Sequence, residues 1–363
     1  MRSRRRGPQR HAVIIAGGRG VRFWPRSRID RPKQLLAPLG GPTLLRRTFE
    51  RLRSSFPAEN IWVVTARRLL EAVSSELPEV PPGRLIGEPV ARGTAPAAGL
   101  AAALIHHQDP DALMGVFPAD HHIGNEQQYR GLLESALTAA DADRLIVLGI
   151  QPQRPETGFG YIEFADPIQP GHSQAVPVTR FREKPDRRTA EEFVQSGRLY
   201  WNSGQFFWRA AVLAEEMQRH LPDTWTALAA ITGGDAGEVD ERLAERYREC
   251  AHVSVDTGIL ERSDQVWGLA APDIGWSDLG SWESLRALLP QDDAGNCAPT
   301  PGTLVRSSGN YLDVPSKHVA LLGVSDLVIV ETPDALLVCP RHEAQNLSEV
   351  TSSLADDDHK HLL

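Results

Sequence analysis

An alternation of short β-rich runs with helical stretches, from His11 to about Leu148, constrains the fold more than any other feature. The β-rich runs are HAVIIA (11–16), NIWVVT (60–65), RLIGE (84–88), ALMGVFP (112–118) and RLIVLGI (144–150). Between them, segments 43–54, 66–77, 94–107 and 125–141 carry apolar residues at helical spacing. This order is typical of a parallel sheet covered by helices, so it predicts an open α/β half.

The pattern loosens between residues 151 and 290, where we expect shorter strands and the second wall of a cleft. The aromatic-rich runs there are GFGYIEF (158–164), VTRFREKP (178–185) and WNSGQFFW (201–208). A linker-like segment, 290–301, precedes short strands in 303–339 and a closing helix near 341–355. We therefore predict two domains, 1–290 and 291–363, with residues 1–10 as a flexible arm and the second domain as a small all-β module.

Composition and charge indicate which classes of binding partner and which location to expect. The 363 residues contain 39 Lys and Arg against 47 Asp and Glu, a net charge of −8, which disfavours nucleic acid. Apolar runs such as 12–16 are far shorter than the roughly 20 residues that span a bilayer, so no membrane partner is expected. The three cysteines, Cys250, Cys297 and Cys339, form no CxxC pair, which favours buried free thiols and a cytoplasmic location.

A glycine-rich, basic loop follows the first β-rich run. In AGGRGVRFWPRSRIDRPKQ (16–34), Gly17, Gly18 and Gly20 precede Arg22, further arginines and Lys33. Glycines let backbone N–H groups turn toward an anion, and basic side chains supply the countercharge. The spacing matches neither GxGxxG nor GxxxxGK[ST]. The loop predicts phosphate binding, and the alternative is a tight strand-to-helix turn.

Lysine is scarce, since it occurs only at positions 33, 184, 317 and 360. A compact ammonium can reach one phosphate oxygen without the geometry of a planar guanidinium. Lys33 in RPKQ and Lys184 in REKP therefore stand out as candidates for contacts that arginine cannot replace. The alternative for each is an ordinary surface lysine.

Two aspartates are candidate metal ligands. Asp120 in FPADH follows an apolar strand, at the edge where open α/β sheets bind ligands, and Asp278 lies in GWSDLGSW. Two carboxylates near phosphates suggest Mg²⁺. The alternatives are a helix N-cap for Asp120 and a turn residue for Asp278. The histidine pairs 106–107 and 121–122 lack a spaced third ligand and make a poor zinc set.

Three further motifs combine glycine with polar groups that suit sugar hydroxyls. They are GFGY (158–161), which contains Gly160, Glu183-Lys184-Pro185, and WNSG (201–204), which contains Asn202. Carboxylates and amides accept and donate to adjacent hydroxyls, and glycine lets a ring approach the backbone. Ordinary turn and hairpin residues are the alternative for each motif.

Taken in order, the motifs resemble the mannose-1-phosphate guanylyltransferases, or GDP-mannose pyrophosphorylases, of the sugar-nucleotidyltransferase superfamily, over about residues 11–350. The matching segments are AGGRGVRFWPRSR, RPKQ, GEPVARGTAPA, FPADH, ETGFGYIEF, FREKP, WNSGQFFW and GWSDLGSW. The resemblance implies a Rossmann-like α/β/α domain with a small β-helix-like C-terminal module. It also implies Mg²⁺-assisted, in-line transfer of GMP from GTP to mannose 1-phosphate. The sequence stops without the isomerase domain of longer relatives, so a monofunctional enzyme is expected.

The resemblance also implies roles for individual residues. The triphosphate would be held by Gly17, Gly18, Gly20 and Arg22, the reacting phosphates by Lys33, and Mg²⁺ by Asp120 and Asp278. Mannose 1-phosphate would contact Gly160, Glu183, Lys184 and Asn202. Glu88 and Thr94 would lie near guanine or its ribose, with a helix-capping role as the alternative for Glu88. Two departures are Gly93, where relatives usually have Asn, and Arg262, where Lys is common.

Other functions remain open at this point. One is transfer of another nucleotide or to another sugar 1-phosphate. A second is a catalytically silent nucleotide-sugar sensor, although such a protein should lack Lys33, Asp120 or Asp278. The missing GxGxxG excludes a dehydrogenase. The expected partners are GTP and mannose 1-phosphate, and a homo-oligomer is left open.

Overall fold

The computed structural model describes residues 7–18, 20–356 and 359–363. Its contacts divide the chain into two compact units, which are described separately. The first unit comprises residues 1–17, 49–119 and 123–276, and the second comprises 18–48, 120–122 and 277–363. The domain boundary at 290 remains a prediction.

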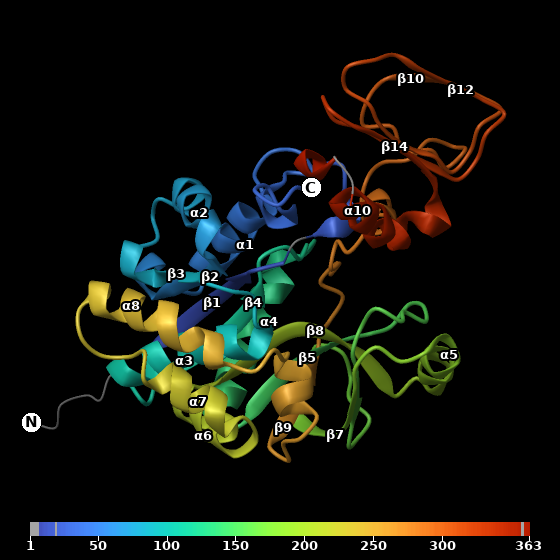
Figure 1. Cartoon of the computed structure of the whole chain (residues 1–363). Coiled ribbons are helices and arrows are strands. Elements are labelled where there is room, and N and C mark those ends of the chain that lie inside the picture. Colours follow the sequence, from blue (N-terminus) through green and yellow to red (C-terminus); the bar gives the residue numbers. More distant parts are fainter. Residues whose placement is uncertain (1–6, 19, 357–358) are drawn as a thin grey trace, which may run out of the picture. The chain divides into compact units, whose positions relative to one another are not determined.

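The first unit is built on a nine-stranded sheet with the order β3-β2-β1-β4-β8-β5-β9-β7-β6 (Figure 1). Its strands are β1 (Arg10–Ala16), β2 (Ile61–Ala66), β3 (Leu85–Glu88), β4 (Leu113–Pro118), β5 (Leu145–Ile150), β6 (Tyr161–Phe164), β7 (Val176–Arg182), β8 (Leu199–Arg209) and β9 (Val266–Ala270). The five strands predicted before residue 151 are confirmed within two residues at each end. The α/β class of the sheet domain is confirmed as well.

The sheet is mixed, which corrects the expectation of a parallel sheet. Strand β8 lies between β4 and β5 and runs antiparallel to both. Phe206 and Trp208 belong to the core on one face, whereas Phe207 packs edge-on against Phe117 on the other. Because β8 is apolar on both faces, it is stable in the middle of a sheet, although it comes from the region expected to form a separate wall.

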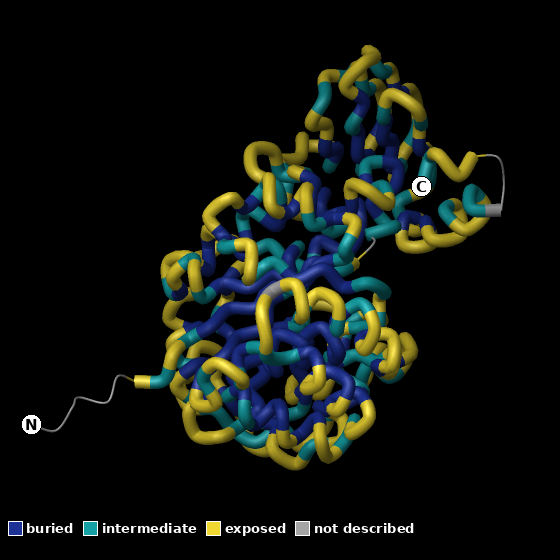
Figure 2. Tube along the Cα trace, turned by 60° about the vertical axis from the view of Figure 1, so that its left-hand side comes forward, coloured by how far each residue is buried: buried dark blue, intermediate teal, exposed yellow. Residues whose placement is uncertain are grey.

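Helices cover both faces of this sheet. They are α2 (Leu70–Glu76), α3 (Thr94–Gln108), α4 (Glu126–Ala140), α5 (Arg187–Ser196), α6 (Ala210–His220), α7 (Pro222–Ala229) and α8 (Ala236–Arg246), with α1 (Leu44–Arg53) crossing from one unit to the other in sequence. Residues of α3, α6 and α7 share one core with the sheet. On the opposite face, Tyr129 of α4 donates to Gln205 of β8. Figure 2 shows the buried residues of this unit, in dark blue, inside a layer of exposed ones.

Helices α6 to α8 were not predicted. The segment AAVLAEEMQRH (210–220) buries Val212, Leu213 and Met217, which lie at helical spacing. Aromatic residues and short turns around this segment obscured that period. These helices pack next to α3 and thereby complete the core.

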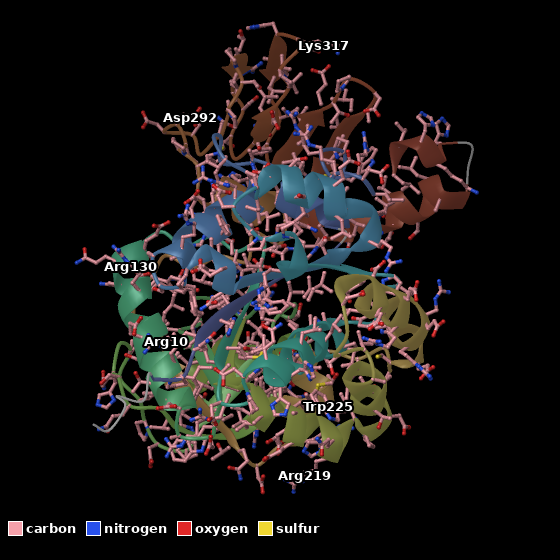
Figure 3. All side chains as sticks on the ribbon, turned by 90° about the vertical axis from the view of Figure 1, so that its left-hand side faces the viewer. Arg10, Arg130, Arg219, Trp225, Asp292 and Lys317 are labelled. Atoms are coloured by element: carbon pink, nitrogen blue, oxygen red, sulfur yellow. The ribbon has the colours of Figure 1, made fainter. Side chains whose placement is uncertain are left out.

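The start of the chain corrects one boundary. Arg10 was assigned to a flexible arm, but it begins β1, pairs with Leu113 and lies 2.7 Å from the Glu134 carboxylate of α4 (Figure 3). Residues 1–6 of that predicted arm lie outside the described part of the chain. The strand extends because Gln9 already accepts a hydrogen bond from the Leu113 N–H group, at 2.8 Å.

The second unit contains the predicted β-rich module. Its strands are β10 (Gly302–Val305), β11 (Tyr311–Asp313), β12 (Val319–Leu322), β13 (Leu327–Glu331) and β14 (Leu336–Pro340), followed by the 3₁₀ helix η8 (Arg341–Asn346) and by α10 (Leu347–Asp356). Strands β10–β12 and β11–β13 pair in parallel, as in a coil of stacked turns, and β13–β14 pair antiparallel. The predicted β module and closing helix are confirmed.

The glycine-rich loop packs against this module within the second unit. The rings of Phe23 and Trp282 lie 4.9 Å apart, and those of Trp282 and Tyr311 lie 5.4 Å apart. The Trp282 indole also donates to the backbone oxygen of Trp24, at 3.1 Å. A buried aromatic stack therefore fixes the loop on the module.

Two predictions about the whole chain can be compared with the described residues. No helix in them has the length and apolar character to cross a membrane. Cys250, Cys297 and Cys339 are free thiols there, the first two buried and the third half-buried.

Candidate active site

The second unit brings Lys33 into contact with both predicted metal-binding aspartates. Lys33 begins the short 3₁₀ helix η2 (Lys33–Leu35) and is 5% exposed. Its Nζ lies 2.8 Å from Oδ2 of Asp120 and donates to the backbone oxygen of Asp278 at 2.7 Å. The ammonium also lies over the Phe23 ring, 5.6 Å from its centre. Lys33 is therefore not an ordinary surface lysine.

Backbone pairing holds the two aspartate segments together. His122 and Ser277 exchange two hydrogen bonds, of 2.8 and 3.1 Å. Burial favours a raised pKa at Asp120, but Lys33, His121 and hydrogen bonds together hold that pKa below its usual value. The Asp120 side chain is 30% exposed, so a ligand can reach an ionised carboxylate there.

The structure distinguishes the two structural alternatives, a helix N-cap for Asp120 and a turn residue for Asp278. Asp120 is not the cap of the next helix, because the Asn125 side chain caps α4. The Asp278 carboxylate does take part in a turn, since its Oδ1 accepts a hydrogen bond from the Gly280 N–H group at 3.0 Å. Its role as a metal ligand stays a prediction.

Gly20 is required by the position of Lys33. It has a φ of +62°, and a Cβ at this position would overlap the Cβ of Lys33. Ser27 adds a hydrogen bond of 2.8 Å from its hydroxyl to the Gly20 oxygen. Gly18, by contrast, has open space where its Cβ would be, so packing does not require glycine there.

Two arginines of the loop, which the sequence associated with phosphate binding, bind carboxylates of the β module. Arg26 binds both oxygens of Asp313, at 2.6 and 3.0 Å, and Arg28 lies 2.8 Å from Asp334. These two arginines attach the loop to the β module and are not free countercharges for phosphate. Arg22 donates to the Gln345 side chain at 3.1 Å, and its contact with a nucleotide stays a prediction. Arg19 lies outside the described residues.

In the first unit, Glu88 lies buried at the carboxyl end of β3. Its Oε1 accepts a hydrogen bond from the hydroxyl of Tyr247, in the short helix η6 (Tyr247–Glu249). Its Oε2 faces Gly17, where a Cβ would lie 3.2 Å away. Burial raises the pKa of Glu88 to about 7, although the Tyr247 hydrogen bond acts in the opposite direction.

Gly93 and Thr94 anchor the start of α3. Gly93 has a φ of +86°, and a Cβ there would lie 2.5 Å from the Val253 oxygen, so glycine fits at this position. Thr94 accepts a hydrogen bond from the Val255 N–H group at 2.9 Å. The N-cap of α3 is Gly93, and no described side chain caps this helix, so the capping alternative for Glu88 is wrong.

The first unit also brings the predicted sugar-binding residues together. The Asn202 N–H donates to the Gly160 oxygen at 2.8 Å, and a Cβ at Gly160 would lie 2.6 Å from Oε2 of Glu183. Lys184 Nζ lies 2.7 Å from Oε1 of Glu183. Glycine at 160 thus leaves the room that Glu183 occupies, and three hairpin motifs converge on one place.

Asp256 belongs to this group, and sequence reasoning missed it. The Asn202 side-chain amide donates to Oδ1 of Asp256 at 2.7 Å. Burial and the nearby charge of Glu183 raise the pKa of Asp256 to about 6. Asp256 starts a π-helical turn, η7 (Asp256–Leu260), a rare geometry that is frequent at functional sites. The signal available was an aspartate after an apolar run, SVDTGIL, which is weak.

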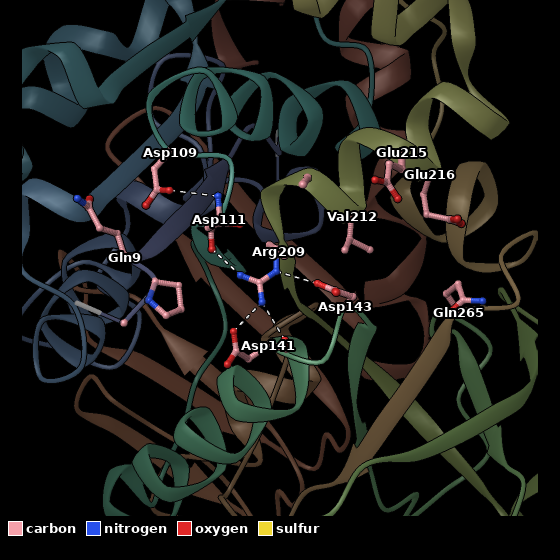
Figure 4. A pocket seen from close by; sticks show the side chains of 13 residues that line it. Gln9, Asp109, Asp111, Asp141, Asp143, Arg209, Val212, Glu215, Glu216 and Gln265 are labelled. Carbon is pink, nitrogen blue, oxygen red and sulfur yellow. Dashed lines mark hydrogen bonds and ion pairs between the residues drawn. The ribbon is translucent and has the colours of Figure 1, made fainter. Parts of the chain in front are cut away.

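A hollow of about 890 Å³ lies beside the amino ends of β4 and β5, at the edge of the sheet opposite to the carboxyl ends of these strands (Figure 4). Its acidic lining surrounds Arg209, which binds Asp141 at 2.7 Å and Asp143 at 2.8 Å. Arg209 also donates to the Asp111 oxygen, at 2.7 Å. Because this arginine joins the end of β8 to the loops before β4 and β5, its surroundings are explained by structure, and none of the predicted site residues lines the hollow.

Family models match nearly the whole chain. Residues 11–294 match the nucleotidyl transferase family, and residues 304–354 match the mannose-phosphate isomerase/GMP-like β-helix domain. The first match ends within the segment 290–301 that the sequence marked as a linker, and the second begins after it.

Individual relatives share sequence over almost the full chain. Mannose-1-phosphate guanylyltransferase ManC of Salmonella typhimurium is 38% identical over 97% of this chain and 74% of its own length. The mannose-1-phosphate guanylyltransferase of Escherichia coli strain K12 is 36% identical over 97% of this chain and 75% of its own. A crystal structure from Thermus thermophilus, described as a mannose-1-phosphate geranyltransferase, has a TM-score of 0.84 and 34% identity, covering 96% of this chain and 99% of that one.

Proposed function

We propose that this chain, which belongs to the nucleotidyl transferase family and within it to the mannose-1-phosphate guanylyltransferases, transfers GMP from GTP to α-D-mannose 1-phosphate, forming GDP-mannose and pyrophosphate. The observation that carries the proposal is the contact of Lys33 with Asp120 and with the Asp278 backbone. It joins three separate motifs of the family resemblance in one charged cluster. A catalytically silent sensor would not need that cluster.

The reaction asks little of the side chains beyond charge and position. A sugar phosphate has a second pKa near 6, so it is largely a dianion at neutral pH and needs no general base. Its oxygen attacks the α-phosphorus of GTP in line, the new P–O bond forms, and the bond to pyrophosphate breaks. Lys33, held in place by two acceptors, stabilises negative charge on the phosphates in this step. Arg22 would contribute a second positive charge, and the backbone at Gly17, Gly18 and Gly20 would contact the triphosphate.

Asp120 and Asp278 fit a site for Mg²⁺. This ion takes one or two protein carboxylates and completes its shell with phosphate oxygens and water. The low pKa of Asp120 keeps one such ligand ionised, and its partial exposure leaves it accessible. Among the described residues no cluster of three or more acidic, histidine or cysteine side chains could hold a metal alone, so the phosphates would supply the remaining ligands. When bound, Mg²⁺ would neutralise charge on the nucleotide phosphates.

The residues around Asn202 suit mannose 1-phosphate. Glu183 and Asp256 accept hydrogen bonds, Asn202 donates and accepts, and Gly160 leaves the backbone open to a ring. Lys184 lies in the same group and supplies a positive charge for the phosphate. Sugar hydroxyls are hydrogen-bond donors, so a group rich in carboxylates favours a hydroxylated ligand.

Glu88 is proposed to bind guanine, with Thr94 near the base or ribose. The Watson–Crick edge of guanine offers N1–H and the 2-amino group, and a carboxylate can accept from both. Glu88→Gln swaps one acceptor for a donor, which should penalise GTP and spare ITP, because ITP lacks the 2-amino group. Equal losses of kcat/KM for the two nucleotides would contradict 2-amino recognition by Glu88.

Pyrophosphate release tests the whole proposal. The chain is assayed with GTP, ATP, UTP and dTTP, each against mannose 1-phosphate and glucose 1-phosphate. We expect the highest kcat/KM for GTP with mannose 1-phosphate. A higher value for another pair would identify a different nucleotidyltransferase, and no release with any pair would leave the sensor function.

A further inference from the structure

The Tyr247 hydroxyl is hydrogen-bonded to the Glu88 carboxylate. Tyr247 has no exposed surface, and its hydroxyl donates to Oε1 of Glu88. Burial, together with the charge of Glu88, raises the pKa of Tyr247, so the phenol remains a donor at neutral pH. A buried carboxylate with one oxygen held in this way has a fixed orientation.

The backbone around Tyr247 is fastened to the segment after Glu88. The Arg92 guanidinium donates to the Arg248 oxygen at 2.6 Å, and the Val253 N–H donates to the Arg92 oxygen at 3.0 Å. Thr94 holds the Val255 N–H group, as described above. Residues 88–94 and 247–255 therefore form one rigid assembly, which sets the position of the phenol relative to the carboxylate.

The second oxygen of Glu88 lies beside Gly17, just past the carboxyl end of β1. Oε2 faces the Cα of Gly17, the first glycine after β1, and a side chain at Gly17 would crowd it. With Oε1 held by the phenol, Oε2 is the oxygen that remains for a ligand approaching the end of β1.

We infer that Tyr247 is a positioning residue for guanine selection, which holds one oxygen of Glu88 so that the other is presented to the base as a hydrogen-bond acceptor. The inference rests on the proposed binding of guanine by Glu88. No atom of Tyr247 needs to touch the nucleotide.

The charge state of Glu88 provides a specific readout. A carboxylate accepts more strongly from the guanine donors when it is ionised, and the pKa of Glu88 is about 7, so the KM for GTP should rise as pH falls through that value. The Tyr247 hydrogen bond lowers this pKa, so its loss should move the midpoint to higher pH. Arg92 and Cys250 also face Tyr247. Burial raises the pKa of Cys250 to about 11, so this thiol does not titrate near neutral pH.

Tyr247→Phe in the full chain tests the inference, because it removes only the hydroxyl. KM and kcat are measured for GTP and ITP at several pH values around neutrality. The Glu88→Gln variant is measured in the same way, because its pH profile shows how titration of the substrates alone changes KM. Tyr200→Phe is the matched control, since Tyr200 is buried and its hydroxyl donates to the Ile168 oxygen at 3.2 Å. Thermal melting shows whether each variant is folded.

For Tyr247→Phe we expect KM for GTP to rise about tenfold near pH 7, as loss of one hydrogen bond to a charged group allows. The kcat and the KM for mannose 1-phosphate should stay near wild type, and the midpoint of the KM profile should move to higher pH. In a Glu88→Gln background the same substitution should add nothing. Tyr200→Phe should leave both KM values and the midpoint unchanged.

Three results would overturn the inference. If Glu88→Gln raises KM for GTP while Tyr247→Phe does not, Glu88 keeps its proposed role and Tyr247 has none. If Tyr247→Phe raises KM for GTP, ITP and mannose 1-phosphate equally with an unchanged midpoint, its role is structural only. If Glu88→Gln leaves KM for GTP unchanged, both the guanine role of Glu88 and the inference fail.

Discussion

The ammonium of Lys33 lies 2.8 Å from Oδ2 of Asp120, although the two residues are far apart in sequence. A second contact, to the backbone oxygen of Asp278, fixes the same ammonium at 2.7 Å. Because Lys33 is almost fully buried, its charge is held in place before any ligand binds. A fixed charge stabilises a transition state without reorganisation during the reaction.

Lys33→Arg should lower kcat strongly even though charge is kept. The guanidinium is wider than an ammonium and cannot satisfy Asp120 and the Asp278 oxygen in the same space. Loss of one preorganised charge typically reduces rate by about 10² to 10³. Steady-state kinetics checks this, and a loss below roughly tenfold would show that arginine replaces Lys33 adequately.

Lys317→Arg is the matched control for that substitution. Lys317 pairs with Glu331 in the β module and is 71% exposed. It should keep wild-type kcat. An equal loss in both variants would show that the effect of Lys33→Arg comes from general destabilisation.

Asp120→Ala and Asp278→Ala should each abolish Mg²⁺-dependent turnover while the chain stays folded, because each removes a charged ligand and little core volume. Activity is measured while the Mg²⁺ concentration is varied, and folding is followed by circular dichroism. Asp240→Ala is the control, since Asp240 is 65% exposed and pairs with Arg67 on the surface. Near-wild-type activity in either variant would remove that residue from the metal site.

Asp256→Asn should weaken binding of mannose 1-phosphate selectively. Asparagine can still accept from Asn202, but it replaces the other carboxylate oxygen with a donor. A hydrogen bond to a charged group contributes about 1.5–3 kcal/mol, so the KM for the sugar phosphate should rise at least about tenfold with little change for GTP. Asp264→Asn, at a 70% exposed position, is the control. An unchanged KM for mannose 1-phosphate would exclude Asp256 from the sugar site.

Glu88→Gln should change how stability depends on pH. The folded-state pKa of Glu88 is about 7, above its ordinary value of 4.5, so the folded state binds more protons than the unfolded state between these values. Stability of the wild type therefore falls as pH rises through this window, by up to about 3 kcal/mol from this group. Glutamine cannot ionise, so the variant should gain stability relative to wild type in denaturation at about pH 8 compared with about pH 5. Parallel stability profiles would contradict the buried, titrating carboxylate.

Local patterns were sufficient to predict the five strands before residue 151 and the β module, because strand and helix periods depend on neighbours in sequence. They could not place β8, whose two apolar faces suit the centre of a sheet formed by distant segments. The lysine scarcity and the motif order singled out Lys33, but its contacts with Asp120 and with the Asp278 oxygen were not predicted. The contacts of Arg26 and Arg28 were not predicted either, because their carboxylate partners lie in the β module.

Two residues of the candidate sites carried no usable sequence signal. Asp256 and Tyr247 hydrogen-bond to Asn202 and Glu88, partners that only the fold brings near. An isolated aspartate or tyrosine is common on any chain, so its chemistry depends on burial and on its partner.

One competition experiment tests the central claim most directly. The chain is incubated with Mg²⁺, an equimolar mixture of GTP, ATP, UTP and dTTP, and both mannose 1-phosphate and glucose 1-phosphate, and the products are identified by mass spectrometry with chromatographic separation of the sugars. The account predicts GDP-mannose as the dominant early product, with one pyrophosphate released for each molecule formed. A dominant product with another base or with glucose, or pyrophosphate release without a nucleotide sugar, would contradict it.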